Sequence, residues 1–197
     1  IAFRNAKLTG EPRQQALMGL GRMLRRVHVI PQEKLRDSNL FFGDQSGVDI
    51  RWRMGSVFDD LAELVHRDGK NWTYPLAPDV IVRRLMHTLP VKKVIVALHS
   101  NPGPEHTFVD PATGELTGII DFGDAYFSHP VNDLRRYRAP ADRAAVLAGY
   151  LEGGAVDDDS MATWRVACAQ SDIAAIAFSP ELQADAAAEL DQILSEI

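Results

Sequence analysis

The chain has 197 residues, of which 46% are hydrophobic, and it carries a formal net charge of −6 with a pI near 5.5. This length is sufficient for one globular unit or one large lobe of a bigger protein. The negative charge argues against nucleic acid or an anionic membrane as the main partner, because a polyanion would be repelled on average. A cationic small molecule would be attracted instead.

The single cysteine, Cys168, cannot form an internal disulfide, which fits a reducing compartment. Its neighbours TWRVACAQ indicate a helix interior, so we expect a small core residue rather than a nucleophile. No apolar run approaches the roughly 20 residues that span a bilayer, and no signal peptide opens the chain. We therefore expect a cytoplasmic enzyme or binding protein.

Apolar residues at helical spacing dominate the chain. They predict helices over 12–29, 56–69, 78–89, 132–137, 142–151, 160–178 and 181–197. Ser56 followed by Asp59 forms a capping-box pattern, which predicts that the second helix begins there. The stretch 32–55 is expected to be a loop that could contain a short helix, and Asp157–Asp159 a polar turn and cap.

Three short segments are predicted to be extended. The β-branched run over 94–98 indicates a short buried strand. Segments 107–110 and 116–120 flank the sequence PATGE, whose Pro and Gly are typical of a hairpin turn. The expected fold class is therefore α+β and mainly helical.

Polar side chains are concentrated between Leu98 and Asp133. The sequence His99-Ser100-Asn101 is followed by a loop rich in Pro and Gly that ends at His106, and Ile120-Asp121-Phe122-Gly123-Asp124 follows the second hairpin strand. A carboxylate at a strand end could hold a divalent metal, and the hairpin should bring the two motifs together. A loop that orients an acceptor hydroxyl, beside a metal-holding carboxylate, predicts phosphoryl transfer.

These motifs resemble the H-G-D-x-x-x-x-N and I-D-F-G-D sequences of the aminoglycoside phosphotransferase family, small-molecule kinases with a protein-kinase-like fold. The resemblance extends to LRRVHVIP, which ends the first helix, and to HPVNDL at Asp133. It implies that residues 1–197 form the C-terminal lobe of that fold, with a short β-hairpin carrying the metal loop. The ATP-binding N-terminal lobe would lie outside the chain, which shows no glycine-rich phosphate loop or strand lysine.

The resemblance assigns roles by position. Asn101 occupies the position of the family's catalytic Asp, and Ser100 replaces the usual Gly before it. His106 occupies the position of a metal-binding Asn, and Asp121 that of the metal-binding Asp. Ile120 would line the adenine pocket, His99 would be a structural loop histidine, and Asp133 would brace the catalytic loop. The implied cofactors are ATP, or another nucleoside triphosphate, and Mg²⁺, and the implied partner is a small-molecule hydroxyl acceptor such as an aminoglycoside, a macrolide or another alcohol.

Two departures from the family pattern affect the expected activity. An Asn amide is not basic, so Asn101 could only aim a hydroxyl through its carbonyl oxygen; loss of a general base typically costs about 10²- to 10⁴-fold in rate. His106 offers nitrogen to a metal that prefers oxygen. Impaired phosphotransfer is the first hypothesis. The alternative is an inactive relative that binds a ligand or partner.

Acceptor-binding candidates are the acidic residues Asp59, Asp60 and Glu63, which could meet the amines of an aminoglycoside, and Asp124. The first three could equally be acids at the start and on the solvent face of a helix. A set of aromatic residues could wall an apolar acceptor pocket, although burial in the core is the favoured interpretation. This set is Trp52, Trp72 and Tyr74.

Overall fold

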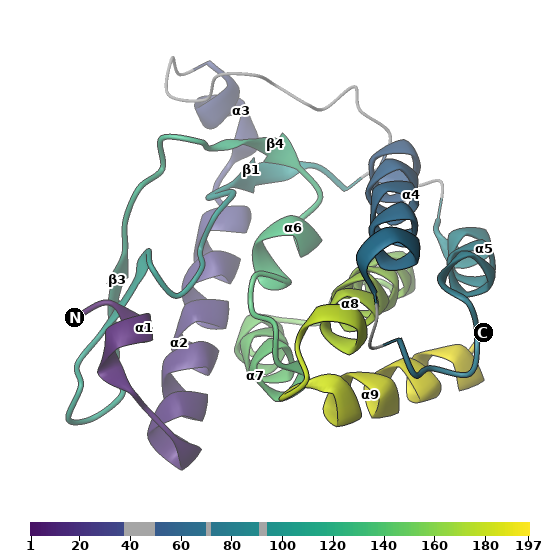
Figure 1. Cartoon of the computed structure of the whole chain (residues 1–197). Helices are drawn as coiled ribbons and strands as arrows, with labels where there is room; N and C mark the ends of the chain where they lie inside the picture. The colour runs from purple at the N-terminus through teal and green to yellow at the C-terminus, as the bar shows by residue number, and fades with distance from the viewer. Residues whose placement is uncertain (38–49, 70–71, 91–93) are drawn as a thin grey trace. The chain divides into compact units, whose positions relative to one another are not determined.

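The computed structural model describes residues 1–37, 50–69, 72–90 and 94–197 (Figure 1). The chain divides into two compact units. The first comprises Ile1–Gly47, Val94–Tyr137 and Ala141–Val156, and the second comprises Val48–Lys93, Arg138–Pro140 and Asp157–Ile197.

The first unit combines helices with two small antiparallel sheets. Its helices are α1 (Phe3–Ala6), α2 (Gly10–His28), α3 (Gln32–Arg36), α6 (Val131–Leu134) and α7 (Pro140–Leu151). Its strands are β1 (Val96–Leu98), β2 (Thr107–Val109), β3 (Leu116–Ile119) and β4 (Tyr126–Ser128). β1 pairs with β4, and β2 pairs with β3 as the predicted hairpin, in a register that places Thr107 opposite Ile119. The hairpin therefore delivers the residues after Ile119 to the start of β2.

Helix α2 buries the face that its sequence pattern predicted, since Leu17, Leu20 and Leu24 are at most 1% exposed. Close approach to α7 depends on glycine. A Cβ on Gly21 would lie 2.0 Å from the carbonyl oxygen of Val146. The backbones can therefore meet only without a side chain at this position.

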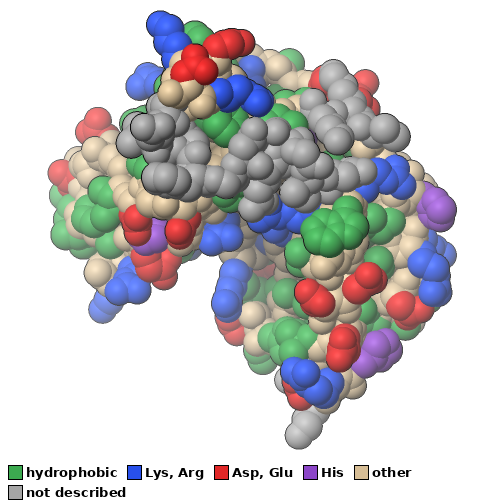
Figure 2. All heavy atoms as spheres, turned by 90° about the horizontal axis from the view of Figure 1, so that it is seen from above, with side chains coloured by type: hydrophobic (Ala, Val, Ile, Leu, Met, Phe, Trp, Pro, Cys, Tyr) green, Lys and Arg blue, Asp and Glu red, His purple; other side chains and the backbone are tan. Residues whose placement is uncertain are grey.

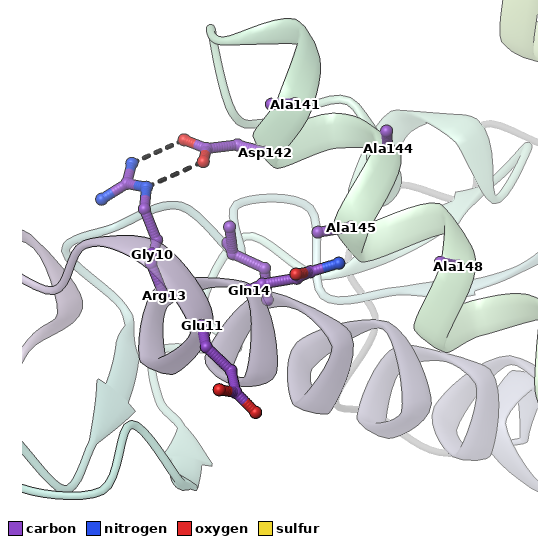
Figure 3. A pocket seen from close by; sticks show the side chains of 10 residues that line it. Gly10, Glu11, Arg13, Gln14, Ala141, Asp142, Ala144, Ala145 and Ala148 are labelled. Atoms are coloured by element: carbon purple, nitrogen blue, oxygen red, sulfur yellow. Dashed lines mark hydrogen bonds and ion pairs between the residues drawn. The ribbon is translucent and has the colours of Figure 1, made fainter.

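A pocket of about 740 Å³ lies between the N-terminal half of α2 and α7 (Figure 3). Arg13 and Asp142 form a bidentate ion pair beside the pocket, in which Nε lies 2.8 Å from Oδ1 and Nη2 lies 2.6 Å from Oδ2. Most of the remaining lining from α7 is alanine. Arg13 and Asp142 are thus engaged with each other and tie α2 to α7.

The second unit is helical. It contains α4 (Ile50–Asp68), α5 (Pro78–Thr88), α8 (Asp158–Phe178) and α9 (Gln183–Ser195), and α8 contacts the other three. Cys168 lies in α8 and is 1% exposed, which confirms the predicted core position. The predicted cap is also confirmed, because the Asp157 side chain accepts a hydrogen bond of 2.9 Å from the Ser160 amide.

Two sequence predictions are wrong in this unit. Helix α4 already includes Ile50, so Ser56 lies inside the helix and does not cap it. The helix runs through this position because Ile50, Met54 and Phe58 all lie on its buried face. Trp52 is 69% exposed, so it is not a core aromatic residue. Trp72 and Tyr74 form an edge-to-face pair with ring centroids 6.0 Å apart.

The remaining differences are at short elements and helix ends. α1 and β4 were not predicted, and α6 is shorter than the expected 132–137. α3 is the short helix allowed for in the stretch 32–55, and the loop predicted for 38–49 lies outside the described residues. None of the helices among the described residues has the length and hydrophobicity needed to cross a membrane. Figure 2 shows acidic, basic and hydrophobic side chains interspersed on the visible face, as is usual for protein surfaces.

Candidate active site

The two predicted motifs meet in the first unit. The loop before β2 is closed by a tight turn, in which the amides of His106 and Thr107 both donate to the Gly103 carbonyl at 3.0 Å. The Ile120 amide then donates to the His106 carbonyl at 3.0 Å. Pairing of β2 with β3 thus places Asp121 beside His106, and Asp121 Oδ2 lies 3.6 Å from His106 Nε2.

His99 links the two motifs and has a defined tautomer. Its Nε2 lies 2.8 Å from the Ile120 carbonyl oxygen, which can only accept, so Nε2 carries the hydrogen. Its Nδ1 accepts a 3.3 Å hydrogen bond from the Asn101 amide and is therefore unprotonated. Burial lowers the pKa of His99, with the Ile120 carbonyl and the Asp133 charge opposing that shift. These hydrogen bonds hold His99 between the two motifs, and its structural role in the loop stays a prediction.

The Asp133 carboxylate fixes the backbone of the loop at His99 and Ser100. Its Oδ2 accepts from the His99 amide and its Oδ1 from the Ser100 amide, each at 2.8 Å. His28 Nε2 lies 3.0 Å from Oδ2, and His28 Nδ1 lies 3.0 Å from the Tyr150 hydroxyl. We call Asp133, His28, Tyr150 and the backbone of His99 and Ser100 the Asp133 network. The side chains of His28 and Asp133 are 1% and 0% exposed.

The backbone at Ser100 explains why glycine is usual there. Ser100 has φ of 79°, in the left-handed region that favours glycine. The turn directs both the Ser100 and His99 amides toward Asp133. His28 belongs to the LRRVHVIP segment, but the sequence analysis assigns it no role. Its helical spacing after Leu20 and Leu24 indicates a polar residue on the buried face of α2.

Asp121 and His106 have the chemistry of a partial metal site. His106 Nδ1 donates to the Asn101 carbonyl at 2.9 Å, so in the neutral ring the lone pair of Nε2 faces the Asp121 carboxylate. Two electron-pair donors that face each other favour a cation between or beside them. Over the described ranges, no cluster of three or more His, Cys, Asp or Glu residues could hold a metal ion. Mg²⁺ typically takes only one or two protein carboxylates and completes its shell with water and phosphate, so this donor set fits it in part.

Asn101, which the resemblance places at the position of the catalytic Asp, has a neighbour that the sequence analysis missed. Arg136, just after α6, donates from Nη2 to Asn101 Oδ1. Their separation of 35 positions gives no spacing signal in the sequence. We call Asn101, His106, Asp121 and Arg136 the rim, because each lies at the open side of the loop. Asp121 is 60% exposed and His106 23% exposed in their side chains.

The other predicted site residues are exposed. Ile120 is 49% exposed next to the rim, and Asp124 is exposed in the same loop. Asp59, Asp60 and Glu63 are exposed on α4, in the second unit, whereas Asn101 belongs to the first. Their roles in binding nucleotide or acceptor stay predictions.

Comparison with known proteins agrees with the family that the motifs resemble. The sequence model of the Phosphotransferase enzyme family matches residues 2–168. No curated protein matches the chain. The macrolide 2'-phosphotransferase MphH from Brachybacterium faecium superposes with a TM-score of 0.54 at 16% identity, over 90% of this chain and 60% of that enzyme.

Two structures of APH(2")-IIa are also similar. The gentamicin complex gives a TM-score of 0.52 at 15% identity over 98% of this chain and 67% of that protein. The streptomycin–ATP ternary complex gives 0.51 at 16% identity over 98% of this chain and 66% of that protein. The chain thus spans 60 to 67% of these enzymes. At such identities the similarity shows a shared fold, and it confirms the predicted fold class.

Proposed function

Because the chain belongs to the Phosphotransferase enzyme family, as its motifs predicted, we propose that it carries the catalytic loop of an enzyme that moves a phosphoryl group from a nucleoside triphosphate to a hydroxyl of a small molecule. The observation that carries this proposal is the meeting of Asn101, His106 and Asp121 at one rim, with Asp121 Oδ2 3.6 Å from His106 Nε2. ATP as donor is supported by the APH(2")-IIa complex that contains it.

Asp121 and His106 would hold Mg²⁺. When bound, the ion would neutralise charge on the phosphates of the donor. The hydrogen bond from His106 Nδ1 to the Asn101 carbonyl fixes the imidazole with Nε2 toward Asp121. The Asp133 network holds the backbone just before Asn101, so the side chain at the catalytic position starts from a rigid base.

Asn101 would orient the acceptor hydroxyl without removing its proton. One lone pair of Oδ1 is taken by Arg136, and the second can accept from a hydroxyl. The proton must then leave to a phosphate oxygen or to water. A loose transition state tolerates this arrangement, because positioning and charge stabilisation contribute more than the base does. We therefore expect slow but measurable transfer.

Restoring a carboxylate at the catalytic position tests the proposal. In the full-length protein with ATP and Mg²⁺, Asn101→Asp should increase the rate of acceptor-dependent ADP release by about 10²- to 10⁴-fold. Asp121→Asn should reduce transfer to background. The assay would use kanamycin, erythromycin and small diols as acceptors, with phosphorylated product identified by mass spectrometry.

Asp185→Asn is the matched control for Asp121→Asn, because Asp185 is an exposed carboxylate on α9 in the other unit. It should transfer at the parental rate. If Asp121→Asn also keeps the parental rate, the proposed role of the rim in phosphoryl transfer is wrong. If Asn101→Asp transfers no faster than the parent, the carboxylate mechanism does not apply to this site.

A further inference from the structure

The rim contains a positive charge directly at the catalytic position. Arg136 is exposed and contacts the neutral Asn101 side chain. Within the described part of the chain, no carboxylate forms an ion pair with Arg136. Of the other acidic residues in these loops, Glu105 lies 3.7 Å from Arg4, and Asp121 lies beside His106, with which it would hold the metal ion. The guanidinium charge therefore remains available to a ligand.

The contact with Arg136 also sets the direction of the Asn101 amide. A guanidinium can only donate, so it must meet Oδ1, and the NH₂ group points the other way. This contact uses one N–H group of Arg136, so the Asn101 NH₂ group and the other guanidinium N–H groups can donate to a ligand. Such a pair is suited to a carboxylate or phosphate, which accepts several hydrogen bonds and gains from the charge of arginine.

Charges close to the rim, rather than the net charge of −6 of the whole chain, govern which ligand binds there. At physiological salt, exposed charges farther away than about 8 Å are largely screened. An acceptor with a cationic group beside the hydroxyl that contacts Asn101 would be repelled by the positive charge of Arg136. An acceptor with an anionic group beside its hydroxyl would be attracted.

We propose that Arg136 and Asn101 bind the anionic group of the acceptor, which is a small alcohol bearing a carboxylate or a phosphate. This inference rests on the proposed function, because it assigns the substrate class of the same rim. Arg136 sets specificity, and Asn101 holds its guanidinium in place while donating to the same anion.

A series of ligands with one carbon skeleton tests this assignment. The probes are glycerate, glycerol 3-phosphate, glycerol and 3-aminopropane-1,2-diol, titrated without nucleotide into the 197-residue chain and followed by NMR shift changes. We expect at least one of the two anionic probes to bind about tenfold more tightly than the ammonium probe. Comparing glycerate with glycerol 3-phosphate identifies which anion is preferred.

Three variants assign the effect to Arg136. Arg136→Gln should remove the tenfold preference, and Arg136→Lys should keep part of it, because lysine retains the charge but not the fork of donors. Arg26→Gln is the matched control, since Arg26 is exposed on α2 and its loss changes the net charge equally. It should leave the preference intact.

Several outcomes would overturn the inference. In these, neither anionic probe binds, the ammonium probe binds equally or more tightly, or Arg136→Gln keeps the full preference. Inorganic phosphate that binds as tightly as the anionic alcohols would also overturn it, because the alcohol skeleton would then not be recognised. Failure of the proposed function is separable, because these titrations need no phosphoryl transfer. Transfer to kanamycin without anion binding would leave the proposed function standing and remove only this inference.

Discussion

The Asp133 network and the rim lie within a few residues of each other but differ sharply in their surroundings. Asp133 has a side-chain exposure of 0%, and its two oxygens accept three hydrogen bonds. Asp121, at the rim, is 60% exposed and has one basic neighbour at 3.6 Å. Asp133 lies in α6, and Asp121 lies in the loop that follows β3. One is surrounded by protein donors, and the other is open to solvent and ligands.

This difference separates two tasks that the loop must perform. A buried carboxylate with all its partners present gives a rigid backbone, because any displacement would leave a charge unpaired in a low-dielectric interior. An exposed carboxylate contributes little to stability but can exchange water for metal or phosphate oxygens. We expect substitutions in the network to change stability and substitutions at the rim to change binding and rate.

The largest expected effect is at Asp133. Asp133→Ala should lower the free energy of unfolding by about 3–5 kcal/mol, because it removes the acceptor of two backbone amides and leaves His28 without its carboxylate partner. Urea denaturation followed by circular dichroism measures this loss.

Asp121→Ala is the matched control for that substitution. The same chemical change at the exposed rim should lower the free energy of unfolding by only about 1 kcal/mol, because Asp121 has a positive φ of 71° and accepts one exposed hydrogen bond from the Gly123 amide. Comparable losses in the two variants would mean that the rim, too, is part of the folding framework, and the proposed division between the two regions would not hold.

The next effect is a pH dependence that comes from His99. Because burial lowers the pKa of His99 below its ordinary value of 6.5, the unfolded chain takes up this proton at a higher pH than the folded chain does. The stabilising contribution is therefore complete above pH 6.5 and is lost as the pH falls toward the folded pKa, at no more than about 1.4 kcal/mol per pH unit.

Urea unfolding at about pH 7.5 and about pH 5.5 measures this dependence. These values lie about one unit above and below the ordinary pKa of histidine. His99→Gln cannot titrate and should show a shallower loss toward acid than the parent. His66→Gln, at an exposed position of α4, should show the parental slope. An unchanged slope in His99→Gln would contradict the origin assigned to it.

Periodic elements were predictable from the sequence, and the short ones were not. Helices α2, α5 and α8 follow their apolar spacing. Strand β4 has only three residues and exists through its pairing with β1, about 30 residues away, which no local pattern encodes. The mistaken start of α4 came from preferring the local Ser56 signal over the buried residues Ile50 and Met54, which continue the same helical face.

The site shows the same division. Asp121 and His106 could be predicted as neighbours because a short hairpin joins their loops. The contact of His28 with Asp133 spans 105 residues, and that of Arg136 with Asn101 spans 35. Such contacts depend on how α2 and α6 pack in three dimensions. Motif order predicted Asn101, His106 and Asp121 of the rim, but Arg136 and the contact of His28 with Asp133 required the structure.

The smallest expected effect is at Ser100, where the network meets the rim. Ser100→Gly should raise the free energy of unfolding by about 0.5–1 kcal/mol, because relief of the positive φ of 79° outweighs the added freedom of the unfolded chain. Ser56→Gly is the control with the opposite sign: Ser56 is exposed inside α4, where glycine should cost about 0.5 kcal/mol. Both are measured by urea denaturation. A loss at Ser100 as well would show that its side chain contributes more to the loop than its backbone strain costs, and the network would then extend into the rim through Ser100.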